Sequence, residues 1–245
     1  MIYKSMMTAA LAGTVFMASA GELAHWSYDG QDGPTHWGEL APEFATCAAG
    51  KNQSPVNISG AIDSDLTEIK LDYKPGGYEV INNGHTIQVN YQPGSHIALD
   101  GHEYELKQFH FHSPSENLIE SRQYPMEVHF VHADKDGNLA VVAVMFESGA
   151  ENKTLSDVWN KMPHVVGEKQ SLAHLTSAGE LIPAEKTYFR FNGSLTTPPC
   201  SEGVTWLVMD HTDDASAEQL NAFLHTMHHS NNRPVQPLNA RIIVR

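Results

Sequence analysis

Cysteine is scarce in this chain, which has only Cys47 and Cys200 among its 245 residues. A metal site built on a pair of thiolates is therefore disfavoured. In an oxidising compartment an even pair favours one disulfide, although two free buried thiols have the same composition. A disulfide between positions so far apart closes a very long loop, and on the entropic view it stabilises the fold by about 4 to 5 kcal/mol.

Positive charge is also in short supply, with 15 Lys and Arg against 29 Asp and Glu and a formal net charge of −14. Nucleic acid and anionic membrane surfaces bind basic patches, so neither is expected as a partner. Linkers, internal repeats and low-complexity tracts are absent as well, which favours one compact domain. The acidity itself indicates little beyond solubility.

Long apolar runs are absent after the N-terminus, and no segment reaches the roughly 18 residues that a membrane helix needs. Lys4 precedes an apolar run at 6–17, and Ala18-Ser19-Ala20 follows it. This order is typical of a secretory signal peptide. We therefore predict a signal peptide at 1–20 and an exported chain at 21–245, periplasmic or secreted, although an uncleaved membrane anchor has the same features.

What the chain does contain is a series of hairpin signals. Alternating stretches at 78–81 and 86–91 flank Asn82-Asn83-Gly84, and similar pairs of stretches follow within 96–112 and 126–146. Asn-Gly between alternating runs is typical of a tight hairpin turn. Strands joined by short turns are antiparallel, so we expect a mainly β (α+β) fold with a mostly antiparallel sheet. Further strands are predicted at 69–73, 189–192, 203–211 and 242–244.

Helices are few. One helical pattern of apolar residues runs from 155 to 162 and stops at Pro163. A second follows Ser216 and Gln219, which resemble a capping box, and reaches about 228. Near its end lie His225, His228 and His229, where a surface metal site is one interpretation and a favourable interaction with the helix dipole is the other.

Histidines alternate with phenylalanines in Gln108-Phe109-His110-Phe111-His112, and His129 lies in a second strand-like stretch at 126–131. Side chains of a β-strand point alternately to two faces, so His110 and His112 share one face. Pairing the two strands brings three imidazoles together, which is the ligand set of a catalytic zinc with an open fourth position. Because the chain has 15 His, chance His-x-His pairs are the alternative.

Two polar residues strengthen the zinc interpretation. Gln108 and Glu127 each lie two residues before a candidate ligand, on the same face of the strand. From there a side-chain oxygen can accept the second ring N–H of His110 or His129 and fix its tautomer. Elsewhere such side chains are usually edge residues in contact with water, but beside three candidate ligands they favour a metal site.

The loop at 193–200 contains Thr196 and the consecutive Pro198 and Pro199. Two prolines fix two φ angles and remove two donors, so the loop is expected to be stiff. A stiff loop can hold Thr196 as a positioned hydroxyl, and Cys200 can tether it to Cys47. An ordinary connecting loop is the alternative.

In their joint order, Gln108–His112, Ser115-Glu116, Glu127-Val128-His129 and Ser194–Pro199 resemble the α-class carbonic anhydrases of the exported bacterial branch. The resemblance extends over essentially the whole mature chain. It implies a single domain with a large, twisted, mostly antiparallel central sheet and a few peripheral helices. It also implies one Zn²⁺ per chain at the bottom of a conical cleft, and reversible hydration of carbon dioxide to bicarbonate and a proton. Relatives in this branch are often homodimers.

By the same resemblance, His110, His112 and His129 are the zinc ligands. Gln108 and Glu127 match the hydrogen-bond partners of His110 and His129. The family role of these five residues agrees with the one that strand periodicity suggests for them.

The resemblance also implies roles that the residues alone do not indicate. Thr196, whose hydroxyl donates a hydrogen bond to Glu116, orients the zinc-bound hydroxide that attacks carbon dioxide, and His85 shuttles the released proton to bulk solvent. Tyr28 orders water in the cleft. The pocket for carbon dioxide comprises Val131, Val141, Leu195, Thr197, Val204 and Trp206.

Two positions depart from the family pattern. Phe191 stands where Tyr is more usual, so a hydroxyl near Thr196 is missing, and Asn117 follows Glu116 where some members carry His. Asn231 and Arg233 match structural positions near the C-terminus. Because the family includes inactive relatives, an exported zinc-binding module with vestigial activity is the alternative to an enzyme.

Overall fold

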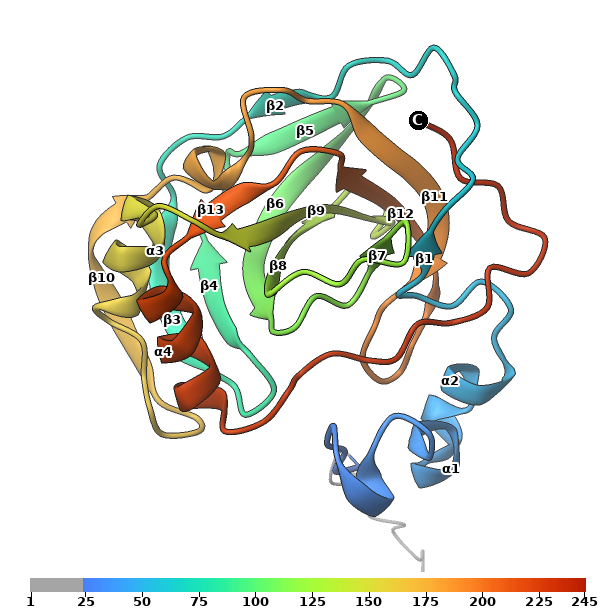
Figure 1. Cartoon of the computed structure of the whole chain (residues 1–245), viewed down its shortest axis with the longest axis horizontal. Coiled ribbons are helices and arrows are strands. Elements are labelled where there is room, and N and C mark those ends of the chain that lie inside the picture. Colours follow the sequence, from blue (N-terminus) through green and yellow to red (C-terminus); the bar gives the residue numbers. More distant parts are fainter. Residues whose placement is uncertain (1–23) are drawn as a thin grey trace, which may run out of the picture.

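The structure is a computed structural model that describes residues 24–245. The predicted signal peptide at 1–20 lies outside these residues. Within the described range, one large sheet of 11 strands is surrounded by short helices and loops (Figure 1). Its strands are β2 (Lys70–Asp72), β3 (Gly77–Asn82), β4 (Ile87–Tyr91), β5 (His96–Leu99), β6 (His102–His112), β8 (Met126–Ala133), β9 (Leu139–Ser148), β10 (Lys169–Thr176), β11 (Tyr188–Ser194), β12 (Glu202–Met209) and β13 (Asp213–Ala215).

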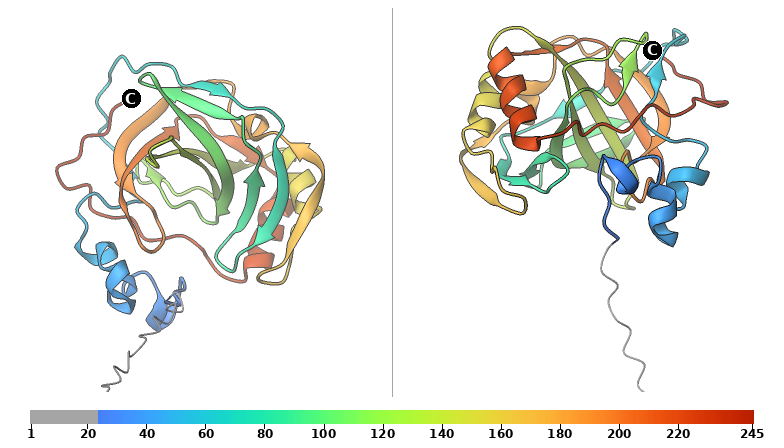
Figure 2. Two further views of the ribbon diagram at one scale, coloured as in Figure 1. Left: turned by 180° about the vertical axis from the view of Figure 1, so that it is seen from behind. Right: turned by 60° about the horizontal axis from the view of Figure 1, so that its bottom comes forward.

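The order of the strands is β10-β3-β4-β6-β8-β9-β12-β11, with β5 beside β6, β2 beside β5 and β13 beside β9. Neighbours are antiparallel except where β12 and β13 run parallel to β9. The expected mostly antiparallel sheet is therefore confirmed, and both views of Figure 2 show its strong twist. A separate parallel pair is formed by β1 (Asn57–Ile58) and β7 (Leu118–Ile119).

The turn between β3 and β4 has the geometry that its sequence predicts. Oδ1 of Asn83 accepts the backbone N–H groups of His85 and Thr86 at 2.9 and 2.8 Å. Gly84 has φ of 87°, a left-handed conformation that favours glycine. The turn therefore holds His85 directly before β4, at one end of the sheet.

The helices are short and peripheral. The two longest are α3 (Lys153–Trp159) and α4 (Ala217–Met227), and they pack against each other beside β10. The predicted capping box of α4 is present, with Ser216 and Gln219 in reciprocal hydrogen bonds. The ring of Trp159 stacks on Phe223 with centroids 5.8 Å apart. Short helical turns also follow Trp26: η1 (Gly30–Asp32), α1 (Trp37–Leu40), η2 (Pro42–Phe44), α2 (Thr46–Ala49) and, later, η3 (Ala178–Leu181).

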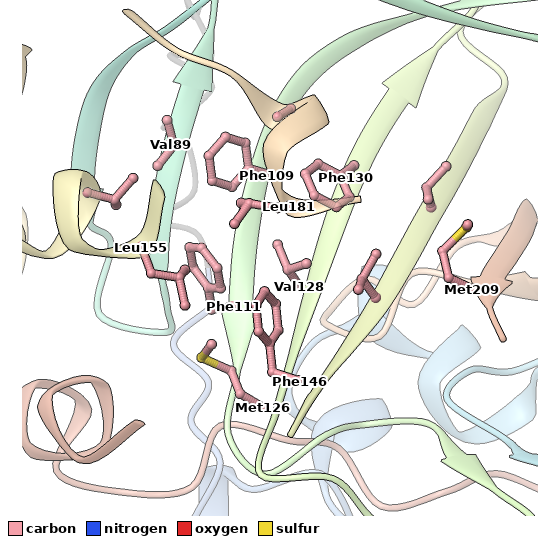
Figure 3. Close-up of a cluster of buried hydrophobic side chains, with 14 of the residues drawn as sticks. Val89, Phe109, Phe111, Met126, Val128, Phe130, Phe146, Leu155, Leu181 and Met209 are labelled. Carbon is pink, nitrogen blue, oxygen red and sulfur yellow. The ribbon is translucent and has the colours of Figure 1, made fainter. Parts of the chain in front are cut away.

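The main hydrophobic core lies on one face of β6, β8 and β9 (Figure 3). Phe109, Phe111, Val128 and Phe130 are all fully buried there. Burying each such side chain stabilises the fold by about 1.5 to 3 kcal/mol. Because strand side chains alternate, the residues between these four point to the opposite face of the sheet.

The structure corrects two details of the sequence interpretation. The predicted strand at 242–244 is wrong, since Val244 alone forms single bridges with Ile62 and Arg190. Strand β10 was not predicted: seven of its eight residues are exposed or half-buried, so it lacks the apolar alternation of a strand with one buried face. Among the described residues, no helix is both long and apolar enough to cross a membrane.

Candidate metal centre

Three histidines converge on the face of β6 and β8 opposite the main core. His110 of β6 pairs directly with His129 of β8, and His112 pairs with Glu127. Ligand nitrogens of His110, His112 and His129 all lie within 4.8 Å of one another. The alternation of the two strands therefore brings together the residues that the sequence predicts.

The second nitrogen of each ring is engaged by an oxygen that can only accept. Nδ1 of His110 donates to Oε1 of Gln108 (2.8 Å), and Nε2 of His129 donates to Oε1 of Glu127 (2.9 Å). Nδ1 of His112 donates to the backbone carbonyl of Asn231 (2.7 Å). These bonds fix the tautomers, so the lone pairs of Nε2, Nε2 and Nδ1 of His110, His112 and His129 are free for a metal.

The chemistry of this donor set matches a zinc ion. Nε2 of His112 is buried and has no hydrogen-bond partner among the described residues. Burial lowers the pKa of all three imidazoles, most strongly for His110 and His129, so they are neutral. Neutral imidazoles with free lone pairs are zinc ligands, and three of them leave one coordination position open.

This trio is the one such group that the described residues contain. The cluster at the end of α4 does not form a second one. The rings of His225 and His228 are 5.8 Å apart, but no third ligand lies within reach. The surface metal site considered from the sequence therefore has no support in the described part of the chain.

Glu127 is held by more contacts than the sequence suggested. Its carboxylate is fully buried and accepts the backbone N–H groups of Glu116 and Asn117 at 2.7 and 2.9 Å. It also accepts Nδ2 of Asn117 at 2.7 Å. The departure at Asn117 is thus accommodated by a direct hydrogen bond to the carboxylate that holds His129.

Glu116 lies beside the ligands. Its Oε1 accepts the backbone N–H of Arg233 at 2.8 Å, and its Oε2 is 3.6 Å from Nε2 of His112 and 3.9 Å from Nδ1 of His129. Burial raises the pKa of Glu116 to about 8, while hydrogen bonds from Arg233 and Thr196 lower it. A cation held by the three histidines would lower the pKa of Glu116 and favour the carboxylate.

The loop of Thr196 is tied to the rest of the molecule at several points. The predicted disulfide joins Cys200 to Cys47 of α2. The N–H of Cys200 donates to the carbonyl of Thr197 at 2.9 Å, and Oγ of Ser194 accepts the N–H of Ser54 at 2.9 Å. The stiff loop expected from its two prolines is therefore also fastened from outside.

Arg233 connects this region to the N-terminal segment. Its guanidinium is buried and donates to the carbonyls of Ser54 (2.8 Å) and Cys47 (3.0 Å), and it lies over the ring of Trp37 at 5.5 Å. The backbone N–H of the same residue holds Glu116. The sequence indicated only a structural role for Arg233. Its partners Ser54, Cys47 and Glu116 lie far from it in the chain, so no local pattern predicts these contacts.

A cavity of about 140 Å³ opens beside the histidines. Its lining includes Trp26, Tyr28, His85, Gln108, His110, His112 and Thr197. The hydroxyl of Tyr28 is buried without a hydrogen-bond partner among the described residues. A larger groove of about 300 Å³ lies elsewhere, beside Tyr188 and Arg245, and it contains none of the predicted site residues.

The apolar residues predicted for the substrate pocket lie together. Val141, Val204 and Trp206 belong to a second buried cluster, and Val131 and Leu195 pack against it. The ring of Trp206 is 4.9 Å from that of His129, in an edge-on arrangement. The rings of Phe191 and Trp206 stack with centroids 6.1 Å apart, so Phe191 keeps an aromatic contact although it lacks the hydroxyl of the more usual tyrosine.

Comparison with known proteins identifies this architecture. The family model described as eukaryotic-type carbonic anhydrase matches residues 32–245. The chain belongs to this family, the α-class carbonic anhydrases. It is 48% identical to the carbonic anhydrase of Pectobacterium carotovorum over 236 residues, which are 96% of this chain and 97% of that protein. It is 51% identical to the Neisseria gonorrhoeae carbonic anhydrase over 239 residues, 96% and 93% of the two chains.

The solved structures agree. The α-carbonic anhydrase of Thermovibrio ammonificans, determined with the inhibitor sulfanilamide, has a TM-score of 0.89 and 46% sequence identity, with 91% of this chain and 99% of that chain covered. The expected fold and family are confirmed. The protein is an enzyme with carbonic anhydrase activity (EC 4.2.1.1), which acts on carbon dioxide and bicarbonate. The alternative of a vestigial zinc-binding module is thereby set aside.

Proposed function

We propose that this enzyme interconverts carbon dioxide and bicarbonate at one Zn²⁺ bound by His110, His112 and His129. The observation that carries the proposal is the set of three neutral imidazoles whose second nitrogens are all engaged and whose lone pairs converge within 4.8 Å. When bound, zinc lowers the pKa of a coordinated water to about 7 and so supplies a nucleophile at neutral pH, a value for which carbonic anhydrase is itself the reference case.

Thr196 and Glu116 orient that nucleophile. As a carboxylate, Glu116 can accept a hydrogen bond from the hydroxyl of Thr196, and such a bond lowers the pKa of Glu116. The Thr196 oxygen then has only lone pairs to offer on its other side, so it would accept a hydrogen bond from a nucleophile at the metal site and orient it. The backbone N–H of Arg233 fixes the carboxylate from behind. Orientation of this kind reduces the entropy that the reaction must lose.

Carbon dioxide is held by apolar contact. Val131, Val141, Leu195, Val204 and Trp206 form one wall beside His129, and Thr197 lines the adjoining cavity. The substrate has no charge and little polarity, so such a wall binds it without competing for the metal. Bicarbonate, which is charged, binds poorly to this wall and leaves through the cavity.

His85 carries the released proton away from the metal centre. Its ring lies in the cavity and stacks on Trp26 at 3.7 Å with planes 9° apart. Burial, His25 and His229 lower its pKa from the usual value of 6.5, which favours the neutral ring that can accept a proton from the metal centre. The unpartnered hydroxyl of Tyr28 is available to bind a water molecule in the same cavity.

The proposed setting is the periplasm or the exterior of the cell, where disulfides persist. The disulfide between Cys47 and Cys200 and the signal-peptide pattern at 1–20 both support export. The catalytic domain is then 21–245. We also propose a homodimer, because the exported relatives that the chain resembles are often homodimers.

The test is a metal titration of the mature protein. We expect one zinc per chain, loss of carbon dioxide hydration after chelation, and full recovery when one equivalent of zinc is returned. Equal rates in metal-free and zinc-loaded protein, or a requirement for further equivalents, would refute the proposal.

A further inference from the structure

Three histidines from distant parts of the sequence lie near one another, and one of them, His85, lines the cavity. His85 lies on the turn before β4, His25 precedes the aromatic segment at the start of the described chain, and His229 follows α4. Both His25 and His229 are near enough to lower the pKa of His85 by electrostatic repulsion. Figure 2 shows the chain after α4 running past the N-terminal segment on this side of the molecule.

Aromatic rings join these histidines into one group. Trp26 stacks on His85 at 3.7 Å, Tyr28 packs edge-on against Trp26 at 5.5 Å, and the ring of His229 lies 6.0 Å from that of Tyr28. Asn231 adds a link, since its Nδ2 donates to the backbone carbonyl of His85 at 3.0 Å. The segment of His229 is therefore fastened to the segment of His85.

One ring nitrogen of His229 is engaged and the other is free. Its Nδ1 is 3.0 Å from the backbone carbonyl of Ser230, which can only accept, so Nδ1 carries the hydrogen and Nε2 keeps a free lone pair. His228 ends α4 in a left-handed conformation with φ of 63°, which turns the chain toward Tyr28. His229 is half-buried, whereas His225 and His228 on the same helix end are exposed.

We propose that His229 is a second proton carrier, which receives the proton from His85 at the cleft mouth and delivers it to solvent, with His25 as a parallel acceptor. This inference depends on the proposed shuttle role of His85. An N–H bond of the His85 imidazolium breaks, the proton passes through water to Nε2 of His229, and a buffer base then removes it. No electrons are transferred, and both imidazoles return to the neutral state.

The charges around His85 favour outward transfer. The groups that face it are His25, His229 and Tyr28, and none of them is an anion at neutral pH that would retain a proton on His85. Burial also disfavours the His85 cation. No neighbouring anion therefore holds a proton on His85.

The test compares His229→Ala with His228→Ala and His225→Ala, two matched changes at the same helix end. In dilute, bulky buffer we expect His229→Ala to lower kcat about twofold to fivefold, less than the 10²–10⁴ typical of a positioned proton-transfer group because His25 and water remain. The ratio kcat/KM, which reports the hydration step, is expected to stay constant. Concentrated imidazole should restore kcat, and the two controls should match the wild type.

A second measurement does not depend on activity. The pKa of His85, followed by NMR and assigned from the signal that His85→Ala removes, should rise in His229→Ala and stay constant in the controls. An unchanged kcat in dilute buffer and an unchanged pKa of His85 would overturn the relay.

The His85→Ala variant separates this inference from the function on which it depends. A buffer-dependent loss in His85→Ala without one in His229→Ala overturns the relay alone. The absence of any buffer-dependent loss in His85→Ala refutes the shuttle role and the relay together.

Discussion

The two faces of β6 and β8 have opposite requirements although they alternate residue by residue. On one face, Phe109, Phe111 and Phe130 fill a core and need only volume and shape. On the other, His110 and His129 have every ring nitrogen either hydrogen-bonded or reserved for a metal. The first face determines whether the chain folds, and the second determines what the folded chain does.

The largest effect is expected on the polar face. His129→Ala should abolish zinc retention and lower the hydration rate by at least about a thousandfold, because the fall in the pKa of water from 15.7 to about 7 is lost with the metal. Metal analysis and stopped-flow assays check this. His102→Ala, an exposed histidine on β6, is the control and should retain both zinc and rate. An active, metal-free His129→Ala would contradict the assignment.

The matching change on the apolar face should damage stability and leave the chemistry. Phe130→Ala removes a fully buried ring and should lower the free energy of unfolding by about 3 to 5 kcal/mol. Urea unfolding measures this loss, and the folded fraction should still bind one zinc. A folded Phe130→Ala protein that cannot bind zinc would show that the two faces are not separable.

His132 sharpens the comparison, because it lies on β8 but faces the core. Nδ1 of His132 donates to the carbonyl of Ala140 at 3.2 Å, and its Nε2 is 2.7 Å from the hydroxyl of Tyr73. Burial lowers its pKa to about 4, against about 6.5 in an unfolded chain. A histidine that is held neutral by folding opposes the fold when it must be protonated.

The sign follows from linkage. Above pH 6.5 His132 is neutral in both states and does not reduce the free energy of unfolding. As the pH falls from about 6.5 to 4, the unfolded chain binds a proton that folded His132 does not, and the free energy of unfolding falls by about 3 kcal/mol. His132→Gln should reduce this acid-dependent loss. The measurement is urea unfolding of both proteins at neutral and acidic pH. Subtracting the free energy of unfolding of the variant from that of the wild type cancels the contributions of the other titrating groups. Equal slopes in the two proteins would contradict the assigned pKa.

The smallest effect is expected from a residue that touches no ligand. Asn117→Ala removes the side-chain bond to Glu127 but keeps the backbone bond, so zinc affinity should fall by about tenfold, the lower end for partners of ligands. Competition with a chromogenic chelator measures this. Asn221→Ala, exposed on α4, should leave the zinc affinity unchanged. Equal zinc affinity in the two variants would show that the Asn117 side chain does not support zinc binding.

The same contrast explains what the sequence could predict. The core phenylalanines and the pair His110 and His112 follow from a period of two within single strands, and His129 joins the pair once the two strands are placed side by side. The capping box at Ser216 and the hairpin at Gly84 are equally local, and both are present. The exposed edge strand β10 had no such pattern and was missed.

Contacts between distant segments were beyond the sequence. The backbone of Arg233 holds Glu116 across 117 positions, and its guanidinium reaches Cys47 across 186. His112 is fixed by the backbone carbonyl of Asn231, and every residue has a backbone carbonyl, so the residue type at position 231 does not indicate this contact. Family resemblance marked Asn231 and Arg233 only as structural positions near the C-terminus, and only the folded chain relates them to particular atoms of the site.

The coordination of the bound metal tests the central claim most directly. X-ray absorption of the zinc-loaded protein should give three nitrogen neighbours at about 2.0 to 2.1 Å and one exchangeable oxygen. A fourth protein ligand, a sulfur neighbour, or fewer than three imidazoles would contradict the account.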